Sequence, residues 1–378
     1  MAVWPEGILD EGVSMTGKTV NVGIIGCGRI SGHHCRSVLA ADDCNLVAVC
    51  DLLAERAEAY REEFGVAAFT DYRKMLAEHP EIDTVVVATP SGMHYEHALE
   101  VLTEFGRNVV VEKPTFMRPS QVEAVYRTAA EHGLQVFAIF QNRYNRAVQR
   151  VRDGILSGEL GAVRSAAVRV RWCRPQRYYD MAPWRGTFAM DGGCLTNQGI
   201  HHVDLLRTLG GEVTRVCSAH RTMGADIEVE DLATAVLEFE SGAVGTLEVT
   251  TAARHDDFEA SVSLVCENGL AQIGGIAVNE LQVYSPDPET CEPNSEDFSG
   301  NIYGNGHSKA YREIVAALSG LETYPITEAD VEATIRLLNS FYVSSETGGW
   351  VDVLSAGDSS RLGKSDEALA DLYRTARE

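Results

Sequence analysis

The sequence contains no apolar run of the ~20 residues that a membrane-spanning helix needs, so no membrane partner is expected. Residues 1–18 have neither a basic start nor an apolar core, which predicts an extension without a secretion signal and a cytoplasmic protein. The nine cysteines include no Cys-x-x-Cys pair. Their scattered positions and odd number predict reduced thiols, with neither a disulfide framework nor a metal site.

Positive charge is also scarce, because 32 lysines and arginines stand against 55 acids and give a net charge of −23. This balance argues against nucleic acid or an anionic membrane as a partner. The exception is the segment from Arg143 to Arg185, with ten arginines and three acids. Two interpretations remain open: a solvated sheet face or subunit interface with acidic partners, or a pocket for an anionic substrate, since guanidinium groups pair bidentately with phosphate and carboxylate.

A length of 378 residues allows two domains. Strand and helix patterns alternate in the first part, which predicts a parallel, doubly wound α/β sheet. The expected strands lie near residues 20–25, 45–50, 83–88, 108–111 and 135–140. Longer alternating strands follow, near residues 162–172, 233–239, 243–250 and 260–266. Turns at Ser241-Gly242 and Asn268-Gly269 are typical of hairpins, so the second part is expected to be an α+β domain with a large, mostly antiparallel open sheet.

Domain boundaries follow from this change of pattern. We expect an N-terminal extension over 1–18, a nucleotide-binding domain over 19–141, a substrate-binding and oligomerisation domain over 142–353, and a polar C-terminal tail over 354–378. Helical patterns at 307–318 and 327–345 are expected to close the second domain. The sheet of this domain predicts a homodimer or homotetramer.

A glycine-rich turn follows the first expected strand. Val22–Ile25 runs into Gly26-Cys27-Gly28-Arg29-Ile30-Ser31, which is typical of a turn that presents a helix N-terminus to a pyrophosphate. Asp51 ends the second strand, 25 residues beyond Gly26, where a carboxylate binds ribose hydroxyls and repels a 2′-phosphate. This favours NAD over NADP. Asp51 could also cap the helix that starts near Leu53.

A second signal is the β-branched run of residues 108–111, which ends in Glu112-Lys113-Pro114. Ligands of open α/β sheets bind at the carboxyl ends of the strands. Lys113 is therefore predicted to face a nicotinamide ring and a substrate hydroxyl, and the segment from Thr89 to His94, after the preceding strand, is predicted to line the nicotinamide side.

The third signal is the segment from Asp191 to Asp204, where the spacing predicts Asn197 and His201 one turn apart on one helix face. A histidine in such a place can be structural or catalytic. A metal site of His201, His202 and Asp204 is disfavoured, because adjacent side chains project about 100° apart on a helix.

Together these motifs resemble the Gfo/Idh/MocA-type (glucose–fructose oxidoreductase/inositol dehydrogenase) sugar oxidoreductases, from about Asn21 to Val353. The resemblance implies a Rossmann domain, NAD as cofactor and reversible hydride transfer from a secondary sugar alcohol, an EC 1.1.1 type activity. It implies cofactor contacts from Gly26, Gly28, Arg29, Ile30, Asp51, Thr89, Pro90, His94, Glu112, Lys113 and Asn142.

A narrower likeness comes from three segments: 171–180 (Arg-Trp-x-Arg-Pro-Gln-x-Tyr-Tyr-Asp), Trp184-Arg185-Gly186-Thr187, and 197–201. They resemble the branch that oxidises the C3 hydroxyl of UDP-N-acetylglucosaminuronate and related sugar nucleotides. The likeness implies that Lys113, His201 and Asn197 are catalytic. It implies that Lys113, Arg174, Gln176, Tyr179, Trp184, Arg185, Asn197 and His201 bind the anionic sugar.

The assignment of the base stays open, because inositol-type members carry an aspartate where Asn197 stands and His201 then lacks a charged partner. Either His201 or Lys113 could take the hydroxyl proton. The alternatives at the level of activity are a dehydrogenase of a free sugar, inositol or sugar phosphate, an NAD-dependent glycosidase, and a non-enzymatic NAD-dependent regulator.

Overall fold

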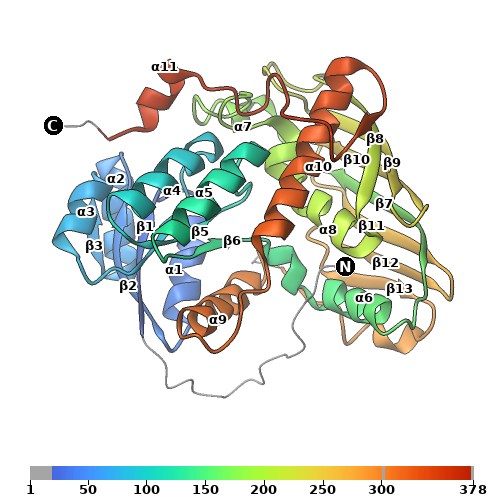
Figure 1. Ribbon diagram of the computed structural model, residues 1–378, viewed down its shortest axis with the longest axis horizontal. Helices are drawn as coiled ribbons and strands as arrows, with labels where there is room; N and C mark the ends of the chain where they lie inside the picture. Colours follow the sequence, from blue (N-terminus) through green and yellow to red (C-terminus); the bar gives the residue numbers. More distant parts are fainter. Residues whose placement is uncertain (1–18, 300–302, 376–378) are drawn as a thin grey trace.

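The computed structural model of the protein describes residues 19–299 and 303–375. The expectations for residues 1–18 lie outside this part of the chain. Two sheets dominate the described residues, and each lies in its own half of the molecule (Figure 1). Among the described helices, none is both long and apolar enough to cross a membrane.

The first half is a six-stranded parallel sheet in the order β3-β2-β1-β4-β5-β6. Its strands are β1 (Val20–Ile25), β2 (Cys44–Cys50), β3 (Ala67–Phe69), β4 (Thr84–Val87), β5 (Asn108–Val111) and β6 (Val136–Ala138). The helices between them are α1 (Ser31–Leu39), α2 (Ala54–Phe64), α3 (Tyr72–Glu78), α4 (His94–Thr103) and α5 (Pro119–Glu131). Because helices cover both faces, the central strands are runs of buried valine and isoleucine. The predicted doubly wound domain is confirmed.

The order of these strands creates the site. β1 lies between β2 and β4, so the chain winds outward in both directions from this point. The carboxyl ends of β1, β2, β4 and β5 therefore meet along one crevice, where such folds bind their ligands. The loops after these strands carry the glycine turn, Asp51, Thr89 and Lys113.

The second half is an eight-stranded sheet in the order β13-β12-β11-β7-β10-β9-β8-β14. Its strands are β7 (Val163–Arg171), β8 (Val213–Arg221), β9 (Leu232–Phe239), β10 (Val244–Thr250), β11 (Glu259–Cys266), β12 (Leu270–Gly274), β13 (Glu280–Tyr284) and β14 (Val351–Asp352). The two predicted hairpins are confirmed, since β9 pairs antiparallel with β10 and β11 with β12. One pair, β7 with β10, is parallel. The sheet is thus mostly antiparallel, as predicted.

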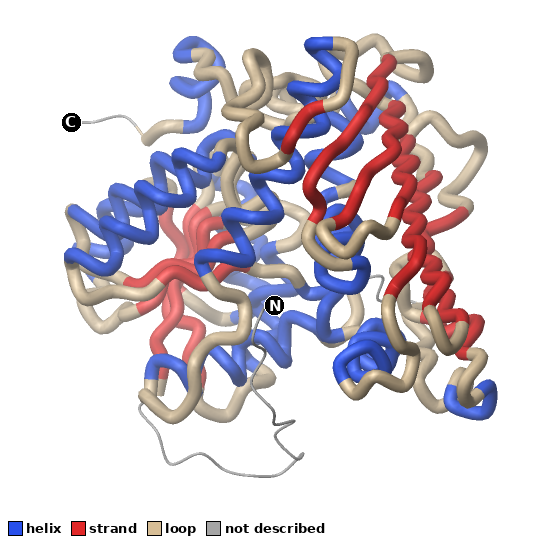
Figure 2. The backbone as a smooth tube through the Cα atoms, turned by 45° about the vertical axis from the view of Figure 1, so that its right-hand side comes forward, coloured by secondary structure: helices blue, strands red, loops and turns tan. Residues whose placement is uncertain are grey.

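Helices cover one face of this sheet only. α8 (Ile200–Gly210) packs on β7 and β11, α6 (Arg146–Leu156) on β12 and β13, and α10 (Glu328–Thr347) on β8. In Figure 2 the strands form the right-hand wall of the molecule and the helices lie to its left. The opposite face carries exposed apolar side chains, among them Val236, Val244 and Val265.

The last two long helices occur where predicted, but they do more than close the second domain. α9 (Gly306–Leu318) packs on α1 and on η2 (Gln141–Tyr144), and α10 packs on α5 as well as on β8. Both helices therefore link the two halves. This difference could not be read from the sequence, because an amphipathic pattern does not say which surface the apolar face will cover.

The polar tail expected after residue 354 packs on the rest of the protein in its described part. Leu362 is fully buried, and Ala370 in α11 (Glu367–Ala370) is buried as well. A short 3₁₀ turn, η5 (Asp371–Tyr373), follows α11. Figure 1 shows this segment in red, running from α10 back over the helices of the Rossmann half and past α7 (Gln176–Tyr179). A few buried apolar residues anchor this segment, so its polar composition did not reveal that it packs on the protein.

Candidate active site

The glycine turn has the backbone geometry that a pyrophosphate needs. Gly26 has φ +97°, and a Cβ there would lie 2.5 Å from the carbonyl oxygen of Ala88. A Cβ at Gly28 would meet nothing within 4 Å, so a ligand could approach that backbone closely. Ser31, at the start of α1, has a buried Oγ with no partner among the described residues. The turn therefore fits NAD, with the exposed Arg29 and half-buried Ile30 at its rim.

Asp51 makes two backbone contacts. Its Oδ1 accepts a hydrogen bond from Leu53 N at 2.9 Å, and its Oδ2 accepts one from Cys27 N at 2.9 Å. The first contact closes a turn ahead of α2, whose N-cap residue is Leu53, so Asp51 is not the helix cap that the sequence allowed. The second was not anticipated, and it ties the end of β2 to the glycine turn. Because each carboxylate oxygen accepts more than one bond, the ribose role of Asp51 stays a prediction.

Glu112 is held by two histidines that sequence reasoning missed. Its Oε1 bonds His34 Nε2 at 2.8 Å and His307 Nε2 at 3.2 Å, and its Oε2 accepts Lys113 N at 3.0 Å. Burial alone would raise the pKa of Glu112, but the bonds from His307 and His34 hold it well below its ordinary value. These atoms are close enough to share a metal ion, yet the hydrogen bonds account for the arrangement. Glu112 therefore fixes the Lys113 backbone from inside the domain.

His94 joins two strand ends. One ring nitrogen, Nδ1, lies 2.9 Å from the Pro114 carbonyl oxygen, and Nε2 lies 3.0 Å from the Thr89 carbonyl oxygen. Burial lowers the pKa of His94. Both ring nitrogens thus face the backbone, so any cofactor contact of His94 would be through its ring carbons. Thr89 and Pro90 are half-buried, as is Asn142 in η2 at the same edge.

Lys113 reaches across to the second half of the molecule. Its Nζ donates to the Asn197 carbonyl oxygen at 2.9 Å and approaches Asn197 Oδ1 at 3.5 Å. The Asn197 amide nitrogen in turn donates to Asp191 Oδ1, while Asp191 Oδ2 accepts Gly186 N at 2.7 Å. A carboxylate is therefore present one contact beyond Asn197. The sequence analysis assigned no role to Asp191. Its position at the start of the segment that contains Asn197 and His201 was the only signal that it belongs to the site.

Burial favours the neutral forms of Lys113 and Asp191. It lowers the pKa of Lys113, an effect that Arg185 and Arg174 add to while Glu112 and Asp191 oppose it. Burial also raises the pKa of Asp191, against the bonds from Gly186 and Asn197. A lysine that loses its proton readily, next to a buried carboxyl group, is suited to proton transfer.

His201 lies near Lys113 with both ring nitrogens buried and without a partner among the described residues. Burial, followed by the charge of Lys113, lowers its pKa well below 6.5, so the ring is neutral at ordinary pH. His202 is also buried without a partner, but no charged group affects its pKa and its ring packs edge-on against Trp172. The structure thus distinguishes a histidine at the site from a histidine of the core.

The helix that carries His201 starts differently from the prediction. Residues Cys194–Gln198 form a wide π-helical turn, η3, before α8 begins at Ile200. Asn197 and His201 therefore do not lie on successive turns of one regular α-helix. π-turns of this kind recur at functional sites, and here the turn brings the Asn197 carbonyl oxygen to Lys113.

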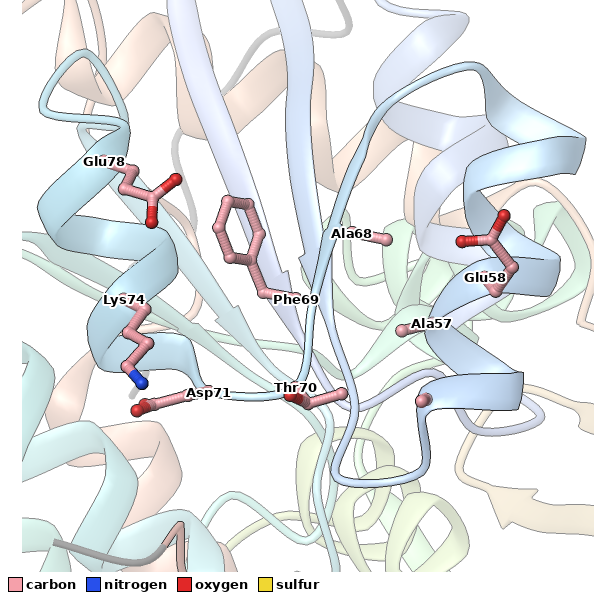
Figure 3. A pocket seen from close by; sticks show the side chains of 9 residues that line it. Ala57, Glu58, Ala68, Phe69, Thr70, Asp71, Lys74 and Glu78 are labelled. Carbon is pink, nitrogen blue, oxygen red and sulfur yellow. The ribbon is translucent and has the colours of Figure 1, made fainter. Parts of the chain in front are cut away.

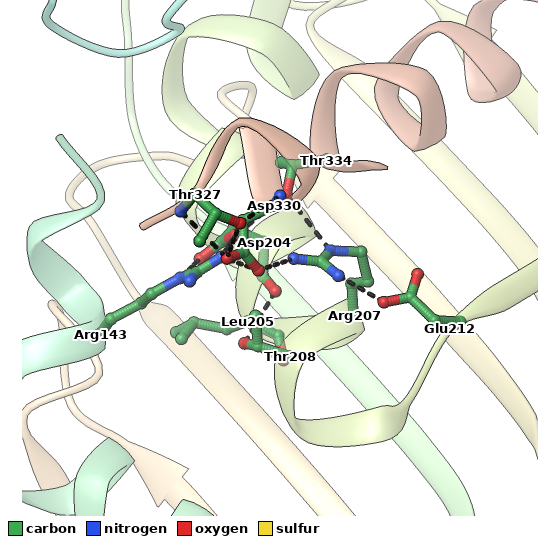
Figure 4. Close-up of polar contacts among 9 residues, drawn as sticks. All are labelled: Arg143, Asp204, Leu205, Arg207, Thr208, Glu212, Thr327, Asp330 and Thr334. Carbon is green, nitrogen blue, oxygen red and sulfur yellow. Dashed lines mark hydrogen bonds and ion pairs between the residues drawn. The ribbon is translucent and has the colours of Figure 1, made fainter. Parts of the chain in front are cut away.

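Asp204 is part of a buried ion network. Arg143 donates to its two carboxylate oxygens at 2.7 and 2.6 Å, and Thr334 Oγ1 donates to it at 3.0 Å (Figure 4). Arg207 pairs with Asp330 at 2.7 Å beside it. Asp204 therefore ties α8 to η2 and α10, and it is not available to form a metal site with the neighbouring histidines.

The arginine cluster divides into two groups. Five of its ten members form the first group and pair with acids: Arg143 with Asp204, Arg150 with Glu159, Arg152 with Asp153, Arg164 with Glu267, and Arg171 with Glu248 and Glu259. Arg174 and Arg185 form the second group, because both influence the pKa of Lys113. Arg171 fits the first interpretation, a sheet face with acidic partners. For Arg174 and Arg185 the second interpretation, a pocket for an anionic substrate, stays open.

Arg185 is stacked between two aromatic rings. Its guanidinium carbon lies 4.3 Å from the Tyr178 ring centroid and 4.6 Å from that of Trp184. Its Nε is buried and has no hydrogen-bond partner in the part of the chain that the structure describes. Arg174 instead pairs with Asp257 at 2.8 Å. Arg185 is thus the cation of the cluster with unused hydrogen-bonding capacity at the site.

Two other predicted substrate contacts are engaged by the protein. The Gln176 amide bonds to Asp180 and to the backbone of Asp226, and the side chain is exposed. The hydroxyl of buried Tyr179 lies 2.9 Å from Thr251 Oγ1. Tyr178, which carried no prediction, is the tyrosine that faces Arg185. The sequence alone does not show which of two neighbouring tyrosines faces the site.

A cavity of about 310 Å³ opens between α2 and α3 beside β3 (Figure 3). It is lined by Ala54, Ala57, Glu58, Ala68, Phe69, Thr70, Asp71, Lys74 and Glu78. None of these residues belongs to the glycine turn or to the group around Lys113. The candidate site is therefore defined by the contacts of Lys113 with Asn197, and not by this cavity.

Comparisons with known proteins agree with this arrangement. The family described as an oxidoreductase family with an NAD-binding Rossmann fold, GFO_IDH_MocA, matches residues 20–140, and the GFO/IDH/MocA C-terminal domain matches residues 148–272. D-glucoside 3-dehydrogenase of Escherichia coli (strain K12) is 30% identical over 260 residues, which span 63% of this chain and 72% of the relative. Myo-inositol 2-dehydrogenase of Thermotoga maritima is 25% identical over 61% of this chain and 68% of its own.

Among solved structures, the WlbA dehydrogenase from Bordetella pertussis, in complex with NADH and UDP-GlcNAcA, is similar with a TM-score of 0.83 and 33% identity. The similarity covers 89% of this chain and 99% of that one. The predicted family, its fold and NAD as cofactor are confirmed by these findings.

Proposed function

This chain belongs to the Gfo/Idh/MocA family of NAD-dependent sugar oxidoreductases, and we propose that it oxidises the C3 hydroxyl of a nucleotide-linked, anionic sugar such as UDP-N-acetylglucosaminuronate. The observation that carries the proposal is Arg185, an aromatic-stacked cation near Lys113 whose Nε has no hydrogen-bond partner among the described residues. A guanidinium in such a place binds a carboxylate or phosphate with charge-assisted hydrogen bonds.

The similarity to the WlbA dehydrogenase, whose structure contains NADH and UDP-GlcNAcA, supports the same substrate class. A second candidate, a dehydrogenase of a free sugar, glucoside or inositol, is favoured by other relatives, because D-glucoside 3-dehydrogenase and myo-inositol 2-dehydrogenase are named for a glucoside and an inositol. The two candidates differ in the need for an anion site. A free sugar would leave Arg185 without a counter-charge in a partly buried position, which costs free energy.

In the proposed mechanism, the glycine turn holds the pyrophosphate of NAD and Asp51 holds a ribose. NAD, when bound, supplies the hydride acceptor. Lys113 takes the proton of the sugar hydroxyl in its neutral form, which burial favours by lowering the lysine pKa. The Asn197 oxygens orient Nζ, and Asp191 fixes the Asn197 amide.

His201 serves as the second contact to the hydroxyl. Its ring is neutral, and protonating it would place a charge in a buried site beside Lys113. The ring therefore accepts or donates one hydrogen bond without changing charge. We therefore assign Lys113 as the base and His201 as the orienting group, where the sequence left both assignments open.

The test is a panel of alcohols offered to the purified protein with NAD, followed by NADH absorbance. We expect UDP-N-acetylglucosaminuronate to exceed UDP-N-acetylglucosamine in kcat/KM by about 10- to 100-fold, because the matched sugar lacks the carboxylate and a charged hydrogen bond contributes roughly 1.5–3 kcal/mol. Myo-inositol, a simple glucoside and glucose 6-phosphate complete the panel. Faster oxidation of any of these three than of either sugar nucleotide would reject the proposal.

A further inference from the structure

The C-terminal segment crosses from one half of the molecule to the other. It leaves the second half where Ser359 Oγ donates to Glu346 of α10 at 2.6 Å. Arg118, which precedes α5 of the Rossmann half, donates to the Gly363 carbonyl oxygen at 3.1 Å, and Gly363 N donates to Phe188 O at 2.9 Å. Residues 364–375, here called the strap, then run over the Rossmann half.

The far end of the strap is anchored on two Rossmann helices. Arg374 donates to both carboxylate oxygens of Glu96 in α4 at 2.8 Å. Arg73 of α3 donates to Thr375 Oγ1, and Thr375 is buried. The strap therefore has fixed points on both halves, although its composition is polar.

Between these two ends the strap packs against residues next to Arg185. Ala370, 6% exposed, forms an apolar cluster with Met93 and Met190. Leu369, Tyr373 and Trp184 pack against that cluster. Trp184 is one of the two rings that stack on the Arg185 guanidinium. A chain of contacts thus leads from the strap through Trp184 to Arg185.

Tyr373 also interacts with both halves of the molecule. Burial raises the pKa of its hydroxyl, while the Trp184 backbone, Arg56 and Arg185 lower it. Arg56 stands in α2, which begins just after Asp51 at the ribose end, and Arg185 stands near Lys113 at the other end.

We propose that the strap is a third part of the substrate site, which positions Arg185 by pinning Trp184 to the Rossmann half. The strap makes no contact with Lys113, so it acts on substrate binding and not on the chemical step. The kinetic consequence rests on the proposed function, because it assumes that Arg185 binds the substrate anion. The structural consequence, that the strap holds Trp184 and Arg185 in place, does not depend on the proposed function.

The experiment compares Ala370→Glu with Leu372→Glu in the full-length protein. Both variants add the same charged side chain to the strap, but Ala370 is buried against the methionines whereas Leu372 is 58% exposed. Ala370→Glu should therefore detach the strap and Leu372→Glu should not. Tyr373→Ala, which removes a ring from the same cluster, is a second detaching variant should Ala370→Glu fail to fold.

The first readout is amide hydrogen exchange over residues 182–191. We expect faster exchange in Ala370→Glu and Tyr373→Ala than in the wild type and Leu372→Glu. Unchanged exchange in both detaching variants would overturn the proposal. This measurement needs no substrate, so it decides the role of the strap even if no sugar nucleotide is oxidised, a result that would reject the proposed function alone.

The second readout is steady-state kinetics with UDP-N-acetylglucosaminuronate. A displaced binding group should raise KM by roughly 3- to 30-fold and leave kcat nearly unchanged. In an Arg185→Ala background, adding Ala370→Glu should raise KM little further, because the group that the strap positions is already gone. Full additivity of the two changes would contradict positioning through Arg185.

Discussion

At the scale of single residues, burial decides which group handles the proton. Lys113 and His201 lie in the same buried region, and burial lowers the pKa of both. The consequence differs because the two start from different ordinary values. A lowered lysine pKa approaches the working pH from above and makes Lys113 a usable base. A lowered histidine pKa moves away from the working pH, so His201 stays neutral.

This difference predicts the pH dependence of sugar oxidation. Only neutral Lys113 can accept a proton, so kcat should rise with pH, be half-maximal at the lowered lysine pKa, below 10.5, and level off above it. Lys113→Met should abolish this rising limb and reduce kcat by roughly 10²–10⁴-fold. The measurement is the initial rate of NADH formation at saturating substrate across the pH range in which the protein stays folded.

His201→Ala is the matched variant. It should lower kcat and keep the rising limb, because the protonation of His201 falls outside that pH range. If His201→Ala removes the limb and Lys113→Met keeps it, the roles of the two residues are reversed.

At the scale of elements, α8 is the support of the site. Its start is the π-turn that brings Asn197 to Lys113, and its middle is fixed by Asp204 to Arg143 and Thr334. Three elements that are distant in sequence, η2, α8 and α10, share this buried network. The family motif therefore combines residues for chemistry with a residue, Asp204, that holds their helix in place.

Removing the carboxylate of Asp204 should be strongly destabilising. Asp204→Ala would leave Arg143 buried beside a lost partner, and breaking a buried ion pair on one side costs about 3–5 kcal/mol. Urea unfolding should show this loss as a lower midpoint with an unchanged slope.

The control for this prediction is Glu123→Ala, which removes an exposed ion pair with Arg127 on α5. Such a pair contributes at most about 1 kcal/mol. Equal effects of the two substitutions would show that the Asp204 network does not stabilise the fold.

At the scale of the whole molecule, the face of the eight-stranded sheet that no helix covers exposes apolar side chains that a second subunit could bury. Val236 is 48% exposed, Val244 53% and Val265 49%, on three strands of one sheet. Arg171 lies on the same face between Glu248 and Glu259. A face with apolar side chains and paired charges is typical of a subunit interface. The predicted homodimer or homotetramer through this sheet remains a prediction.

The double variant Val236→Glu, Val265→Glu should separate the subunits, because it places two charges in the apolar part of the face. Light scattering should then report a mass near the 41.1 kDa of one chain, against at least twice that value for the wild type. Leu156→Glu, on α6 and away from this face, should leave the assembly intact. A wild type of 41.1 kDa would refute the prediction.

Local patterns in the sequence determined much of the fold and part of the site. The buried valine runs of β4 and β5, the glycine turn and the two hairpin turns are set by neighbouring residues, so each occurs where the sequence predicts it. Lys113 and Asp51 could be placed at the crevice for the same reason, since parallel strands in a doubly wound sheet end along one edge.

Only the tertiary structure decided the partners of these residues. Lys113 meets Asn197 across 84 positions, Glu112 meets His307 across 195, and Arg374 meets Glu96 across 278. Most of the arginines that the sequence grouped together separate onto different acids, and the polar C-terminal segment becomes a strap. The physical reason is that pKa, charge pairing and burial depend on neighbours in space, whereas a sequence pattern reports only neighbours along the chain.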